Sequence, residues 1–236
     1  MFRLITITAT AGALALASLA CATPALAATP VPSAPSSHST LAEIQQAGAV
    51  ATADRIRDLT TGIGKVDATS TLSAADKSTV LAALNHDMSG MQALQSKIAA
   101  DTVASAALAD YHSIFTGYRV YAVGLQQTFI AATADGLTGT AIPKLQSAAT
   151  RIAAVFAADP SKATPDLQAK LADMQARTAD AVTKTSGLAA AALAVTPDAY
   201  NANHSVLMDD RSAARNALAD SKAAAQDGRA ILAALT

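Results

Sequence analysis

Histidine and methionine are the residues of this chain best suited to binding a soft metal ion. His204 stands four residues before Met208, one helical turn away, and His86 lies close to Met88 and Met91. Imidazole and thioether groups together suit copper. Met88 and Met91 also fall on one helical face, where methionine fills a core, and His86 is offset from that face toward solvent. The sequence therefore predicts no metal site, and a copper or haem carrier is the alternative.

A second candidate site is the ring-rich stretch 111–129, which holds five of the seven aromatic residues that follow Phe2. Tyr118, Arg119 and Tyr121 are the residues that a pocket for an anionic or aromatic ligand would use. The spacing favours another interpretation, because the rings recur at alternating steps of three and four residues and so share one helical face. This core stripe consists of Tyr111, Phe115, Tyr118, Ala122, Leu125 and Phe129. We expect it to supply bulk to an alanine-rich core.

The acidic residues argue against an enzyme. Of the 18 Asp and Glu residues, only Glu43 is a glutamate, and no histidine follows it three residues later. A di-iron site in a helical bundle is built from glutamates and Glu-x-x-His pairs, so such a site is excluded. The chain also lacks a Gly-x-Ser-x-Gly nucleophile motif and a calcium-binding Asp loop. The sequence predicts no catalytic residues, no enzymatic activity and no cofactor.

Helices must position all of these residues. Alanine makes up about a quarter of the chain, glycine and proline are sparse, and no alternating β-branched run occurs, a composition that favours helix. Gly136, Gly139 and Pro143 weaken the region 136–143, and the sequence leaves open whether they bend one long helix or end it. Clear breaks between helices fall at 68–73, 100–102, 159–165 and 196–205.

Apolar residues between these breaks recur every three or four residues and form narrow seams. The seams are Leu81, Leu84, Met88, Met91 and Ile98; Ile142, Leu145, Ala149, Ile152 and Phe156; and Leu167, Leu171, Met174, Ala181, Leu188 and Val195. Such stripes are typical of helices packed side by side, and short links make neighbouring helices antiparallel. The predicted fold is all-α: an elongated antiparallel up-and-down bundle of about five or six long helices, forming one domain over residues 39–236.

The first 27 residues have the features of a cleaved secretory signal. Arg3 is followed by an apolar, alanine-rich stretch, and the Ala-Leu-Ala at 25–27 offers the small residues that signal peptidase requires. A flexible Pro/Ser/Ala-rich spacer is expected at 28–38. Cys21 raises a competing interpretation, a lipidated cysteine that begins the mature chain, and the sequence leaves the two open.

The chain is close to neutral, with a formal net charge of −1 at pH 7 and with Lys and Arg scattered singly. Neutralising phosphates takes a clustered basic face, so nucleic acid is not an expected partner. No run after the signal reaches the ~20 apolar residues of a membrane span. We expect a secreted, extracellular or cell-envelope protein with a non-catalytic structural or binding role. Its expected partner is a protein or a cell-wall component that the sequence does not identify.

Three stretches, at 71–101, 118–128 and 196–207, carry a resemblance to a group of known sequences. They begin Thr-Leu-Ser-Ala-Ala-Asp, Tyr-Arg-Val-Tyr and Thr-Pro-Asp-Ala-Tyr. They resemble segments of uncharacterised secreted, alanine-rich helical proteins of high-G+C Gram-positive bacteria. The resemblance implies export and a helical bundle, and it transfers no activity and no catalytic residue.

Overall fold

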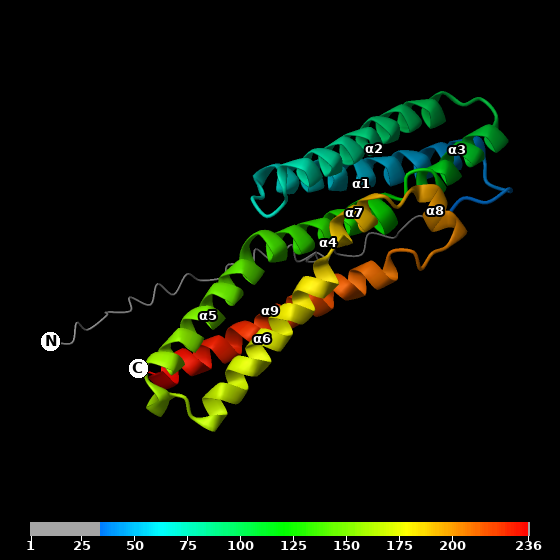
Figure 1. Ribbon diagram of the computed structural model, residues 1–236. Coiled ribbons are helices and arrows are strands. Elements are labelled where there is room, and N and C mark those ends of the chain that lie inside the picture. The colour runs from blue at the N-terminus through cyan, green and yellow to red at the C-terminus, as the bar shows by residue number, and fades with distance from the viewer. Residues whose placement is uncertain (1–33, 236) are drawn as a thin grey trace.

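The computed structural model describes residues 34–235, and this part of the chain is all-α (Figure 1). Within these residues every regular element is a helix, which confirms the predicted fold class. The expected signal at 1–27, which includes Cys21, and the first part of the expected spacer, 28–33, lie outside the described residues.

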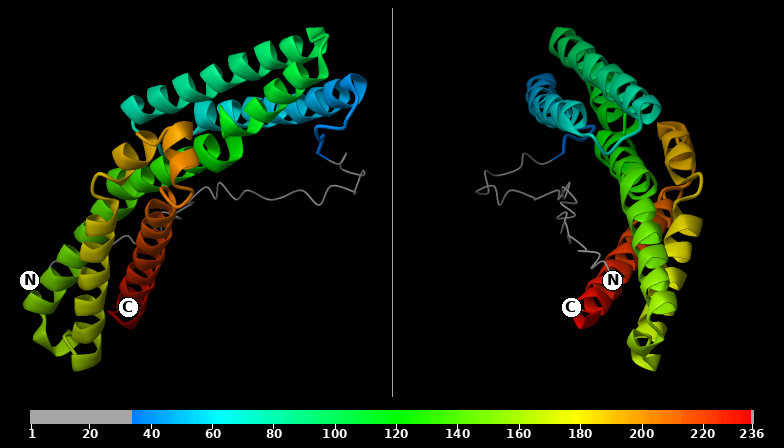
Figure 2. Two further views of the ribbon diagram at one scale, coloured as in Figure 1. Left: turned by 90° about the vertical axis from the view of Figure 1, so that its right-hand side faces the viewer. Right: turned by 60° about the vertical axis from the view of Figure 1, so that its left-hand side comes forward.

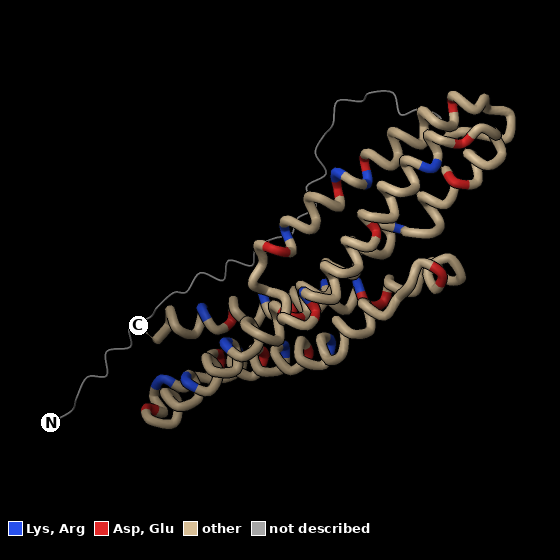
Figure 3. The backbone as a smooth tube through the Cα atoms, turned by 90° about the horizontal axis from the view of Figure 1, so that it is seen from above, with Lys and Arg blue, Asp and Glu red and all other residues tan. Residues whose placement is uncertain are grey.

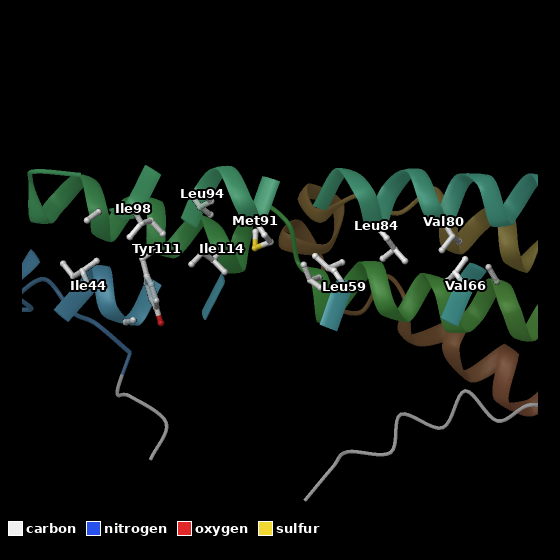
Figure 4. Close-up of a cluster of buried hydrophobic side chains, with 14 of the residues drawn as sticks. Ile44, Leu59, Val66, Val80, Leu84, Met91, Leu94, Ile98, Tyr111 and Ile114 are labelled. Atoms are coloured by element: carbon white, nitrogen blue, oxygen red, sulfur yellow. The ribbon is translucent and has the colours of Figure 1, made fainter. Parts of the chain in front are cut away.

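Three helices pack together at one end of the molecule: α1 (Leu41–Ala68), α2 (Ala74–Ala100) and α3 (Ala104–Thr116). Their buried side chains meet in one hydrophobic cluster (Figure 4). The cluster includes Ile44, Leu59, Val66, Val80, Leu84, Met91, Leu94, Ile98, Tyr111 and Ile114. The seam predicted for 81–98 is therefore core, although Leu81 and Met88 are only partly buried.

A long, interrupted rod runs from this end to the other. After α3, a π-helical turn (Val120–Gly124) leads into α4 (Leu125–Gly136), and a second π-helical turn (Leu137–Ala141) leads into α5 (Ile142–Ala158). The region 136–143 thus bends one long helix and does not end it. Pro143 accounts for the bend, because its ring would crowd the carbonyl four residues earlier in a regular α-helix and the wider π turn relieves this.

The opposite end consists of α5 together with α6 (Pro165–Thr185) and α9 (Met208–Leu235). Their shared core contains Leu145, Ala149, Ile152, Phe156, Leu171, Met174, Ala224 and Ile231, so the predicted seam along α5 is confirmed. Figure 2 shows that this end is inclined to the α1–α2 end. The long elements are therefore α1, α2, the interrupted rod, α6 and α9, which agrees with the predicted five or six.

Two short helices, α7 (Leu188–Leu193) and α8 (Pro197–Ala202), join α6 to α9. The seam predicted to run on from 167 to 195 is interrupted before α7, because Gly187 adopts a left-handed conformation with φ 68°. Glycine occupies this region without the steric cost that other residues meet. α7 then packs beside α4 in the middle of the molecule, and its Leu188 and Ala192 are buried there.

Capping side chains define the helix starts. Thr40 begins α1 with a reciprocal capping box, in which its backbone N–H donates to Glu43 Oε2 (2.7 Å) and its hydroxyl accepts from the Glu43 N–H (3.3 Å). The single glutamate thus has a structural partner. Thr164 caps α6 ahead of Pro165, as the sequence predicts. Ser73 caps α2, and its own N–H donates to Asp135 Oδ2 of α4 (2.7 Å), which ties the first link to the rod.

The expectation of one continuous aromatic face over 111–129 is wrong. α3 ends at Thr116, and Arg119 adopts a left-handed conformation (φ 50°, ψ 37°) before the helix resumes as a π turn. This break rotates the residues beyond it relative to those before it. Tyr111 is buried, whereas Tyr118 and Phe129 are only partly so. The large apolar side chains buried just beyond the break are instead those of Val120, Val123 and Ile130.

Candidate functional site

Tyr118, Arg119 and Tyr121 contact three different neighbours. The Tyr118 ring lies on α2, with its centroid 6.5 Å from that of His86. Arg119 Nε donates to Asn201 Oδ1 of α8 (2.7 Å), and the Asn201 amide donates to the carbonyl of Thr116 (2.8 Å). These two hydrogen bonds hold the left-handed Arg119 in place. The structure therefore does not bring the three predicted residues together around one site.

Tyr121 belongs to a cluster on the face of α1. Its hydroxyl donates to Asp58 Oδ2 (2.7 Å). The guanidinium of Arg55 lies between two rings, 4.5 Å from the centroid of Phe115 and 5.0 Å from that of Tyr121. Each exposed cation–π contact of this kind stabilises by about 0.5–1 kcal/mol. The cluster thus fastens α1 to both sides of the break in the rod.

The surroundings of the Tyr121 hydroxyl keep it protonated. Loss of water around its hydroxyl, and then the hydrogen bond to Asp58 and the charge of that carboxylate, raise the pKa of Tyr121 to about 12. The positive charge of Arg55 opposes the shift. The phenol is therefore a hydrogen-bond donor at physiological pH, and its role here is to fix α1 in place.

Beside this cluster lies an open groove between α1 and α3, with a volume of about 560 Å³. We call it the α1–α3 groove. One wall comes from α1, namely Ala47, Val50, Ala51, Asp54 and Arg55. The other wall comes from α3, namely Tyr111, His112, Phe115 and Thr116. Small side chains on α1 leave the space, and rings on α3 line it.

Helical periodicity explains why these residues share the groove. Ala47, Ala51 and Arg55 follow one another at steps of four, so they lie along one face of α1. Tyr111 and Phe115 do the same on α3, and their ring centroids are 5.1 Å apart. Figure 4 shows the Tyr111 ring pointing away from Ile98 and α2. The floor of the groove is therefore continuous with the core at one end of the molecule.

The polar side chains that line the groove are those of Asp54, Arg55, Tyr111, His112 and Thr116. Arg55 Nη1 donates to the carbonyl of Ala51 (2.9 Å), which leaves other N–H groups of the guanidinium for a ligand. Asp54 is paired with Arg57 at 2.9 Å, and this exposed pair contributes little stability. The arrangement suits an extended, largely apolar ligand whose carbonyl groups meet the guanidinium at the rim.

The residues considered for metal binding lie apart from the groove. His86 is exposed on α2 and faces Tyr118, whereas His204 lies in the turn before α9, with its ring centroid 5.1 Å from that of Tyr200. Met208 is the first residue of α9 and is 61% exposed. Among residues 34–235, no three His, Cys, Asp or Glu side chains are grouped so that they could hold a metal ion.

Charged residues of both signs are scattered over the described part of the chain (Figure 3). The described part of the chain shows no helix with the length and apolar character that crossing a bilayer takes.

Sequence reasoning did not single out Arg55 and Asp58. Their partners, Phe115 and Tyr121, lie about 60 residues further along the chain, and the local sequence around Arg55 looks like an ordinary solvent-facing helix. The only local signal is that Ala51, Arg55 and Asp58 recur at steps of four and three, which places them on one face of α1.

The fold and the groove define an all-α helical bundle protein with a separate hydrophobic core at each end and an open groove lined by aromatic rings. No protein-family model matches the chain, and no curated protein or solved structure matches it either.

Proposed function

We propose that this chain is an exported, non-catalytic helical protein that acts at the cell envelope or outside the cell by binding a partner in the α1–α3 groove. The groove is the observation that carries the proposal. It combines an apolar floor, two rings and one guanidinium with free N–H groups, and such a set of groups suits binding an extended ligand. The partner is a protein or a cell-wall component.

The features of the N-terminus support export. The apolar stretch after Arg3 and the Ala-Leu-Ala at 25–27 are typical of a cleaved signal. The near-neutral charge argues against nucleic acid as the partner.

Export is tested by the intact mass of the protein recovered from medium, envelope and cytoplasm. Cleavage after Ala27 predicts a mature chain that begins at Ala28 in medium or envelope. A mature chain that begins at Cys21 and carries a diacylglyceryl group would instead show a lipid-anchored protein. Full-length protein confined to the cytoplasm would contradict the proposal.

Binding is tested by sedimentation of the purified protein with isolated envelopes of the producing bacterium. Ala51→Glu places a charge on the groove wall and is expected to weaken retention about tenfold, the effect of roughly 1.4 kcal/mol. Ala53→Glu is the matched control, because Ala53 is exposed on the same helix and does not line the groove. Equal retention of the two variants would remove the groove from the proposal.

A further inference from the structure

We propose that Asn203 is a site of N-linked glycosylation, with an oligosaccharide attached to its side-chain amide nitrogen. The sequence at this place is Asn203-His204-Ser205, which matches the acceptor pattern Asn-x-Ser/Thr, in which x is any residue except proline. Such glycans are found on surface loops of secreted proteins. The inference therefore rests on the export that is part of the proposed function.

The sequence and the structure select the same asparagine independently. The chain has four asparagines, and only Asn203 is followed two residues later by a serine or a threonine. The other three lie within helices, namely Asn85 in α2, Asn201 in α8 and Asn216 in α9. Asn203 lies between helices, in the turn that joins α8 to α9 at the outer edge of the molecule (Figure 1). A transferase binds its acceptor as exposed, non-helical chain, and among the asparagines Asn203 meets this condition.

The side chains of the motif are arranged for modification. Asn203, His204 and Ser205 are all exposed. Asn203 Oδ1 accepts hydrogen bonds from the Ser205 N–H (3.0 Å) and from Ser205 Oγ (2.7 Å). The amide and the hydroxyl that the pattern requires are thus in direct contact. Within residues 34–235 no hydrogen bond engages Nδ2 of Asn203, so the atom that would carry the glycan is free.

The amide nitrogens of two other asparagines are occupied. Nδ2 of Asn85 donates to the carbonyl of Leu81 (2.8 Å), and Nδ2 of Asn201 donates to the carbonyl of Thr116 (2.8 Å). A glycan on either would replace a hydrogen bond that the fold uses. At Asn203 it would replace none, and neither α8 nor the motif contributes a buried side chain to a core.

The transfer balances with a donor of one chemical class, an oligosaccharide carried on a polyprenyl diphosphate. Nδ2 of Asn203 forms a bond to the anomeric carbon of the first sugar, and the bond between that carbon and the diphosphate oxygen breaks. The diphosphate leaves with the electron pair, and one Nδ2 proton passes to a base of the transferase. Nothing is oxidised or reduced. This chain supplies only the acceptor.

The reaction is tested with the purified full chain, an oligosaccharyltransferase that accepts Asn-x-Ser/Thr, and a polyprenyl-diphosphate-linked oligosaccharide. Peptide mass spectrometry then maps the products. We expect one glycan, on Asn203. Asn203→Gln and Ser205→Ala should abolish it, while Ser205→Thr, which keeps the hydroxyl, should retain it. An unmodified Asn203 in the folded chain overturns the proposal.

Asp87→Ser provides a matched control, because it creates a second Asn-His-Ser tripeptide at 85–87, within α2. We expect Asn85 of this folded variant to react at least about tenfold more slowly than Asn203, since Asn85 must first leave the helix by local unfolding. Short synthetic peptides that carry the two tripeptides should react at similar rates. Equal rates at the two positions of the folded chain would show that the fold does not select Asn203, and would overturn the proposal.

The same peptide map of protein recovered from medium, envelope and cytoplasm separates this inference from the proposed function. Exported protein that carries a glycan on Asn203 supports both. Exported protein whose Asn203 is entirely unmodified overturns the glycosylation and leaves export standing. Protein confined to the cytoplasm contradicts export, and the reaction of the purified chain then still decides whether Asn203 is an acceptor.

Discussion

The ring of Tyr118 lies directly over the Cα of Gly90 on α2. A Cβ added at position 90 would lie 2.1 Å from Cε1 and 2.4 Å from Oη of Tyr118. Contacts below 3 Å do not occur for real Cβ atoms, so the ring occupies the place that any side chain at position 90 would need. Tyr118, a candidate ligand-binding residue from the sequence, therefore packs the break in the rod onto α2.

Gly90→Ala is expected to lower the free energy of unfolding by about 1–2 kcal/mol, because the new methyl group must push the Tyr118 ring aside. In a Tyr118→Ala background the same change should instead stabilise by about 0.5–1 kcal/mol, the ordinary gain of alanine over glycine in a helix. Chemical denaturation of the four proteins measures this. Gly64→Ala, where no atom lies within 4 Å of the new Cβ, is the control that should stabilise in both backgrounds. Additive effects of the two changes would contradict the contact.

The carboxyl group of Asp87 on α2 should make the free energy of unfolding depend on pH. Burial raises the pKa of its carboxyl from the ordinary 3.8 to about 6, although the nearby His86 charge opposes this. The folded protein therefore binds this proton more tightly than the unfolded chain does. The resulting stabilisation is complete below about pH 4 and is lost as the pH rises through about 6.

Asp87→Asn should raise the melting temperature above pH 6 and flatten its dependence on pH between 4 and 6. The gain is about 1 kcal/mol or less, because solvent screens a half-exposed carboxylate. Thermal unfolding at pH 4, 5, 6 and 7 tests this. The exposed Asp180→Asn should leave the shape of the curve as it is, and an identical curve for Asp87→Asn would refute the assignment.

Arg119 is the one non-glycine residue with positive φ in the described chain. Arg119→Ala and Arg119→Gly both remove the hydrogen bond to Asn201 and so should both destabilise. Only glycine relieves the left-handed strain of about 1–2 kcal/mol. We expect the glycine variant to be the more stable of the two by about 1 kcal/mol in urea denaturation. The opposite order would mean that the conformation costs nothing.

Ser221 lies on the buried face of α9 and is 2% exposed. Its hydroxyl has no hydrogen-bond partner among residues 34–235. A buried hydroxyl without a partner costs about 1–3 kcal/mol, so Ser221→Ala should raise the free energy of unfolding by about 1 kcal/mol. Denaturant titration measures the change. Ser212→Ala, at an exposed position of the same helix, should change stability by a few tenths at most.

The parts of the fold that local chemistry determines were predictable from the sequence. Thr164 and Pro165 start α6 because a hydroxyl cap and a proline at the first turn act within three residues. The α5 seam is regular and is buried throughout. The break at Arg119 was not predictable, because the partner that holds it, Asn201, lies 82 residues away in the sequence.

In the candidate site too, the local features could be predicted from the sequence and the contacts between helices could not. The rings of Tyr111 and Phe115 stand out in the sequence, and their i, i+4 spacing correctly places them on one face of α3. What they face depends on the register of α1 against α3, which decides that Ala51 and Arg55 are the residues opposite. Register between helices is set by packing across the whole cluster, and no local pattern shows it.

The two π turns make the angle between the two ends of the molecule depend on the number of residues in each turn. A π turn holds one residue more than the α-helical turn that it replaces. Loss of a single codon within 137–141 would turn α5 by about 100° relative to α4, and the central cluster of Leu137, Ala141, Ala181 and Ala217 would have to repack around the new angle. Insertion and deletion, more than substitution, are thus the changes by which a lineage of such proteins could vary its angle.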